Sequence, residues 1–108
     1  MENEKVRIDV SINTTFVNIE EQEKYPGVVL NVSRGGVLLG TKDQLAIGDF
    51  VVLSFGLTET ISIQEIEGKV VYSKKTETQD KSVFYNLGVE FSRVTEDNCR
   101  AINTFLDL

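Results

Sequence analysis

The chain has 108 residues, of which 41% are hydrophobic, and its formal net charge is -6. This length and apolar content fit one domain with a single core that needs no disulfide. The negative charge disfavours general binding to DNA or RNA, because such binding depends on neutralising phosphates. One cysteine and no histidine exclude zinc sites of the Cys/His type and favour a reducing compartment.

The sequence predicts neither a membrane segment nor a targeting segment. No apolar run is long enough to span a bilayer, and the chain starts with polar and acidic residues rather than a signal peptide. We therefore expect a cytoplasmic protein with a single domain over residues 1–108, in which residues 1–5 form a flexible N-terminal segment.

The first part of the chain predicts a long strand and a turn. Apolar and polar residues alternate over 6–12, which is typical of a half-buried strand, and residues 16–19 extend it after a bend at 13–15. The charged segment 20–26 ends in Pro26-Gly27 and is expected to form a turn.

The middle of the chain predicts three short strands. Apolar runs at 28–30 and 37–39 flank a polar turn that contains two adjacent glycines, at 31–36. Gly48 and Asp49 predict a hairpin-type turn, which leads into a strand over 50–57.

The last part of the chain predicts further strands and a helix. Residues 61–73 favour one long strand, or two strands joined at a bulge near Gly68. A charged hairpin tip at 74–81 separates it from a clearly alternating strand at 83–91. Thr95 is expected to be the N-cap of a C-terminal helix, whose buried stripe is predicted at Cys99, Ile102, Phe105 and Leu106. These elements predict a mainly β fold, a small six-stranded antiparallel barrel with a C-terminal α-helix.

The turn at 31–36 is the strongest candidate for a binding site. Asn31 and Ser33 share one face of an extended chain and offer an amide and a hydroxyl. Gly35 and Gly36 have no Cβ, so a ligand can approach the main chain and a positive φ costs little. A tight connection between two strands uses the same residue types, and this alternative stays open.

The order of these elements resembles the PilZ domain family. No single segment is specific, but all of them in this order are difficult to obtain by chance. The segments are Asn31-x-Ser33-x-x-Gly36, Leu45-x-x-Gly48-Asp49, Gly68-Lys69-Val70-Val71-Tyr72, Leu87-Gly88-Val89-Glu90-Phe91 and the capped helix. The resemblance covers nearly the whole chain and implies a PilZ-like barrel, a bacterial source and no enzymatic activity. The sequence itself shows no catalytic constellation.

The resemblance also implies a ligand, because many members of the family bind cyclic di-GMP, often as an intercalated dimer. They use an RxxxR segment before the first strand and the [D/N]xSxxG turn. By resemblance, Arg7 would bind phosphate and stack on guanine, and the turn at 31–36 would contact the edge of the base and a phosphate. Arg34 would add a phosphate contact; the alternative for both arginines is a solvated surface position. The candidate ligand residues are Arg7, Asn31, Ser33, Arg34, Gly35 and Gly36.

One position departs from the family pattern. Asn3, not arginine, lies four residues before Arg7, and nearby Lys5 lacks the guanidinium fork. Asn31 replaces the frequent aspartate and offers one accepting oxygen instead of two. Losing one charge-assisted partner costs about 1.5–3 kcal/mol, which is about one to two powers of ten in affinity.

Two hypotheses therefore stay open. In the first, the chain is a cyclic di-GMP receptor with a weakened site that signals to a protein partner. In the second, it is a PilZ-fold interaction adaptor that binds no nucleotide. The sequence predicts no cofactor, and it does not determine the partner, the pathway or the oligomeric state.

Overall fold

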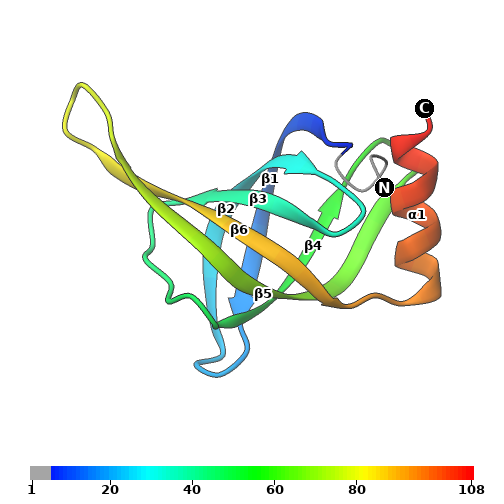
Figure 1. Ribbon diagram of the computed structural model, residues 1–108, viewed down its shortest axis with the longest axis horizontal. Coiled ribbons are helices and arrows are strands. Elements are labelled where there is room, and N and C mark those ends of the chain that lie inside the picture. The colour runs from blue at the N-terminus through cyan, green and yellow to red at the C-terminus, as the bar shows by residue number, and fades with distance from the viewer. Residues whose placement is uncertain (1–5) are drawn as a thin grey trace.

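The computed structural model describes residues 6–108, and these form a closed barrel with one helix (Figure 1). The elements are β1 (Ile8–Asn18), β2 (Glu23–Val32), β3 (Gly36–Thr41), β4 (Phe50–Gly56), β5 (Ser62–Glu77), β6 (Val83–Arg93) and α1 (Glu96–Leu106). The strand order around the barrel is β1-β2-β3-β6-β5-β4, and every neighbouring pair is antiparallel. The predicted six-stranded barrel with a C-terminal helix is confirmed.

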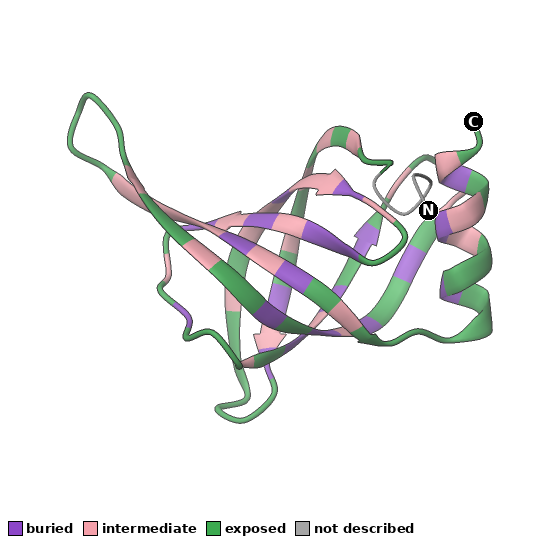
Figure 2. Ribbon diagram, viewed as in Figure 1, coloured by how far each residue is buried: buried purple, intermediate pink, exposed green. Residues whose placement is uncertain are grey.

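Alternate residues of the strands fill the barrel interior (Figure 2). This pattern follows from the period of two in a strand, which sends successive side chains to opposite faces. Ile102 of α1 belongs to the same core, and the helix packs beside β5. The largest fully buried side chains are Phe16, Leu39, Leu53, Ile63, Ile66 and Leu87.

The first hairpin differs from the sequence prediction. β1 runs without a break through 13–15, and its register irregularity lies between Asp9 and Ile12. The turn occupies 19–22, where Gln22 supplies the left-handed backbone with a φ of 57°. The predicted bend and the position of the predicted turn are therefore wrong.

Pro26 and Gly27 lie inside β2 rather than in a turn. A Cβ on Gly27 would lie 3.0 Å from the Phe16 ring and 3.1 Å from the Gly40 carbonyl oxygen. The carbonyl of Pro26 accepts a hydrogen bond from the Thr41 hydroxyl at 2.9 Å. The Pro-Gly pair thus allows close packing between strands instead of forming a turn. The preference of proline and glycine for turns does not reveal this role.

Gly48 adopts the expected positive φ, 102°, but the turn around it is not a hairpin. The flanking strands β3 and β4 are not neighbours in the barrel. The loop instead docks on β5: Gly48 N–H donates to the Val70 carbonyl at 2.7 Å, and Val70 N–H donates to the Asp49 carbonyl at 2.8 Å.

The β5–β6 hairpin is longer than predicted and projects from the barrel (Figure 1). β5 shifts register beside Gly68, which confirms the predicted bulge. The paired strands continue to Glu77, so the tip is 78–82 rather than 74–81. In this tip the Thr78 hydroxyl and the Ser82 N–H donate to the Asp80 carboxylate, which lowers the pKa of Asp80.

Helix α1 begins as predicted, and Ile102 and Phe105 are buried as predicted, but one position of its buried face differs. The Thr95 hydroxyl accepts a hydrogen bond from the Asn98 N–H at 3.2 Å, which confirms the N-cap. Cys99 is exposed and Asn98 is buried, so the prediction that Cys99 lies on the buried stripe is wrong. Within residues 6–108 the structure has no helix whose length and apolar character would allow it to cross a membrane.

Candidate functional site

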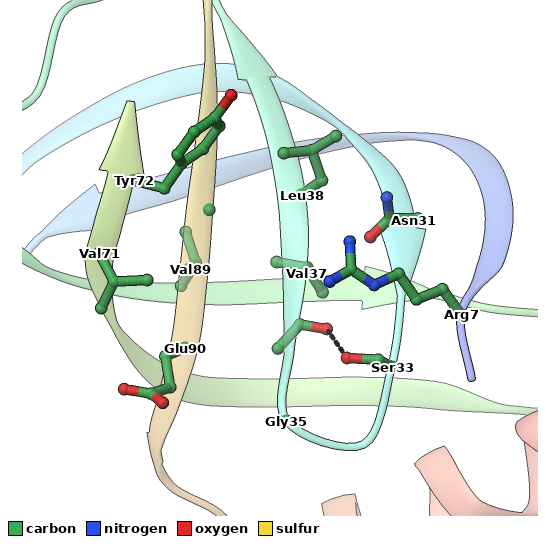
Figure 3. Close-up of a pocket in the computed structure, with 12 residues that line it drawn as sticks. Arg7, Asn31, Ser33, Gly35, Val37, Leu38, Val71, Tyr72, Val89 and Glu90 are labelled. Carbon is green, nitrogen blue, oxygen red and sulfur yellow. Dashed lines mark hydrogen bonds between the residues drawn. The ribbon is translucent and has the colours of Figure 1, made fainter. Parts of the chain in front are cut away.

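The turn between β2 and β3 is fixed by hydrogen bonds at both of its ends. The Ser33 N–H and the Ser33 hydroxyl both donate to the Gly36 carbonyl, at 2.9 and 3.2 Å (Figure 3). The Gly35 carbonyl accepts from the Phe91 N–H at 2.8 Å, which docks the turn on β6. The turn therefore has a defined shape before any ligand binds.

The two glycines of the turn have different surroundings. A Cβ on Gly36 would lie 2.0 Å from the Val89 carbonyl oxygen, whereas a Cβ on Gly35 would meet no heavy atom within 4 Å. Gly48 is the only glycine of residues 6–108 with a positive φ. The turn therefore makes no use of the positive φ that its glycines would permit, and Gly36 is needed because β6 passes so close.

The surface beside the turn is one row of residues that crosses five strands. Register pairs connect Tyr72 to Gly88, Gly88 to Leu38, Leu38 to Asn31, and Asn31 to Asp9. Directly paired residues share a face of the sheet, and here that face is the outside of the barrel. Because Gly88 has no side chain, the row has a bare position between Tyr72 and Leu38.

A pocket of about 580 Å³ lies over this row. Its lining includes Arg7, Asn31, Ser33, Gly35 and Gly36. Figure 3 shows the Arg7 side chain reaching past Asn31 toward Val37, while Val71 and Tyr72 lie on the other side of the pocket. The structure thus brings together five of the six candidate residues, from segments far apart in the sequence.

Arg34 points away from this pocket and contacts the helix. Its Nε donates to Asn103 Oδ1 at 2.7 Å, and its Nη2 lies 3.8 Å from a carboxylate oxygen of Asp107. The last turn of α1 contains no basic residue, so Arg34 supplies the positive charge that favours the C-terminal end of a helix.

The charged residues among the described lining of the pocket are Arg7 and Glu90. A guanidinium offers five N–H donors in a planar fork and suits a phosphate or the O6/N7 edge of guanine. No cluster of metal-ligating side chains occurs within the described part of the chain. The Arg7 guanidinium is therefore the group in this lining that suits an anion. The predicted N-terminal elements, Asn3 and the flexible segment 1–5, lie outside the described residues.

Sequence reasoning did not identify seven of the residues that line the pocket, which are Val37, Leu38, Val71, Tyr72, Gly88, Val89 and Glu90. A signal for two of them exists, because Val70, Val71 and Tyr72 are three consecutive apolar residues, whereas a half-buried strand has a polar residue at every second position. One of two such neighbours must face outward unless a bulge intervenes, and here a register shift between Val70 and Tyr72 leaves both exposed.

A model of the PilZ domain matches residues 3–108. The chain belongs to the PilZ domain family. None of the curated proteins compared with this chain matches it.

Three solved structures are similar in fold to this chain. Apo MrkH from K. pneumonia has a TM-score of 0.79 and 19% identity, over 94% of this chain and 48% of that chain. The inhibitor of motility MotI/DgrA from Bacillus subtilis has a TM-score of 0.71 and 20% identity, over 94% and 48%. The PilZ domain of YcgR from Escherichia coli, solved with c-di-GMP, has a TM-score of 0.72 and 10% identity, over 94% and 86%. This chain thus spans about half the length of MrkH and MotI/DgrA.

Proposed function

We propose that this PilZ domain is a non-enzymatic bacterial signalling module that binds cyclic di-GMP in the pocket over β2, β3 and β6. It would pass the state of this second messenger to a protein partner. The observation that carries the proposal is that Arg7, Asn31 and Ser33 line one pocket. Membership of the family and the structure of the YcgR domain with c-di-GMP support this ligand.

Each polar group of the pocket has a part in this proposal. The Arg7 guanidinium would bind phosphate and the acceptor edge of guanine. The Ser33 hydroxyl donates its hydrogen bond to the Gly36 carbonyl. Its oxygen therefore remains free to accept a hydrogen bond from an N–H of the base. Asn31 would add an amide oxygen and an amide N–H. A phosphate contact from Arg34 would require its guanidinium to leave Asn103 and Asp107, so we give Arg34 the smaller share.

Calorimetric titration of the purified protein with cyclic di-GMP tests this proposal. We expect heat of binding and a raised melting temperature for the wild type, and a loss of about 10- to 100-fold in affinity for Arg7→Ala, because a charge-assisted partner disappears. Arg100→Ala is the matched control, since Arg100 pairs with Glu96 and Asp97 on α1. Absence of heat and of any thermal shift at high ligand concentration would overturn the proposal.

The second candidate is an interaction adaptor that does not bind nucleotide, and Asn3 favours it, because the family pattern has an arginine there. Asn3→Arg discriminates between the two candidates. If the pocket is otherwise intact, this substitution restores a guanidinium, and we expect affinity for cyclic di-GMP to rise at least about tenfold. A protein partner that copurifies with both forms, with no effect of nucleotide on either, would favour the adaptor.

A further inference from the structure

We propose that the free edge of β5, in the projecting β5–β6 hairpin, is a docking surface for a second copy of this chain. In this pair the β5 strands of two molecules run antiparallel and form one ladder centred on Thr76. The interface uses residues 73–77, none of which lines the pocket described above. It therefore goes beyond the proposed nucleotide binding and does not depend on it.

The edge is free because β5 continues past its neighbour β4. The pairing of β4 with β5 starts at Phe50, opposite Lys69, and the preceding loop adds hydrogen bonds only at Val70. Beyond Val70, within residues 6–108, β5 pairs with β6 alone as far as Glu77 (Figure 1). The opposite edge, on β6, is covered by β3 as far as Tyr85, so β5 offers the longer free stretch. A two-stranded ribbon is only marginally stable by itself, and a further strand on its edge would stabilise it.

The backbone groups of Ser73, Lys75 and Glu77 point to this free edge. The Thr78 N–H donates to the Ser82 carbonyl at 2.8 Å, across the hairpin. The direction of the N–H and C=O groups alternates along an antiparallel strand. The groups at 74 and 76 therefore face β6, whereas those at 73, 75 and 77 face outward. An unpaired row of this kind is a template for another strand.

The charges along this edge select both the partner and the register. Lys75 and Glu77 are exposed, and neither forms an ion pair with any residue of 6–108. In an antiparallel pair centred on Thr76, the Lys75 of each copy lies directly opposite the Glu77 of the other, and the two threonines face each other. Both kinds of pair are stabilising at such positions. A ladder centred on Lys74 or Lys75 would instead place two lysines opposite each other, which is unfavourable.

The competing explanation is that these charges protect the edge, since lysine on an edge strand often prevents pairing. Analytical ultracentrifugation without nucleotide separates the two roles. Small interfaces hold weak, transient complexes, so the protein is studied from about 10 μM to 1 mM, and we expect its mass to rise above the 12.1 kDa of the monomer. Lys75→Glu and Glu77→Lys should each weaken association about tenfold or more, because two attractive pairs become repulsive.

The double exchange Lys75→Glu with Glu77→Lys supplies the decisive comparison. It reverses both pairs and keeps them complementary, so we expect association within about threefold of the wild type. Lys24→Glu is the matched control, because Lys24 is an exposed lysine of β2 and lies outside the hairpin. Protection of the edge predicts instead a wild type that is monomeric at every concentration.

The opposed Thr76 residues allow a second, independent measurement. The Cα atoms of a non-hydrogen-bonded antiparallel pair lie about 4.5 Å apart, a distance that a disulfide can bridge. In a Cys99→Ala background with oxidised glutathione, Thr76→Cys should form a linked dimer at least about tenfold faster than Lys74→Cys, whose two copies lie about 13 Å apart along the ladder. A monomeric wild type, a dimer that is indifferent to the charge reversals, or equal rates for the two cysteine variants would overturn the proposal.

Discussion

Gly36 shows how a motif residue can serve the barrel itself. Its missing side chain admits the Val89 carbonyl, and its own carbonyl holds the Ser33 side chain in place. Gly35, one residue earlier, has free space around it. The pair of glycines that looks uniform in the sequence therefore contains one position fixed by packing and one that is open.

This contrast predicts different effects of the same substitution. Gly36→Ala would force β3 and β6 apart, because a backbone carbonyl cannot move aside cheaply, and we expect it to lower the free energy of unfolding by about 1–3 kcal/mol or more. Gly35→Ala should change it by less than about 0.5 kcal/mol. Denaturant unfolding of both variants measures the difference, and equal stabilities would contradict the described packing at Gly36.

The residues of the polar site were accessible from the sequence, whereas the apolar ones were not. A period of two places Asn31 and Ser33 on one face, and both line the pocket as that pattern indicates. Tyr72 and Gly88 meet only through the register of β5 against β6, and register is a non-local property. The same limit explains the helix: hydrophobicity favours Cys99 as the buried residue, while the partner of Asn98 lies on another element.

At the scale of elements, helix α1 is attached to the barrel by two polar contacts in addition to its apolar face. Near its N-terminus, Asn98 accepts from the Gln64 N–H at 3.0 Å and donates to the Gln64 carbonyl at 2.8 Å. Near its C-terminus, Arg34 reaches Asn103 and Asp107. The contact at Asn98 supplies hydrogen-bond partners for the backbone N–H and carbonyl of Gln64 in β5. These groups lie where the register of β5 against β4 shifts, between Leu53 and Phe55 of β4.

The attachment at Asn98 predicts a local loss of stability. Asn98→Ala leaves both backbone groups of Gln64 without their side-chain partner, and we expect a cost of about 1–3 kcal/mol. Hydrogen exchange of the α1 amides should accelerate, while the central strands stay protected, because local opening needs less free energy than global unfolding. Thr104→Ala, an exposed position on the same helix, is the control. Unchanged exchange in Asn98→Ala would show that the apolar face alone holds the helix.

At the scale of the whole molecule, the sequence predicted which segments form strands and the helix better than it predicted which strands pair with one another. Alternation and capping residues were sufficient for six strands and a helix, because these signals are local. Closure of the barrel depends on β1 meeting β4 and β3 meeting β6, which are not consecutive. For this reason the segment at Gly48 is misread as a hairpin: nothing near it indicates that the next strand joins the opposite edge.

The bare backbone at Gly88 has a consequence for comparing this barrel with others of its family. Any larger residue there would lift Tyr72 from β6 and reshape the outer surface, without altering Arg7, Asn31 or Ser33. A homologue could thus retain every polar residue of the ligand-binding motif and still have an outer barrel surface of a different shape. Such chains would be distinguished by a small residue on a remote strand, far outside the stretch in which the signature is usually sought.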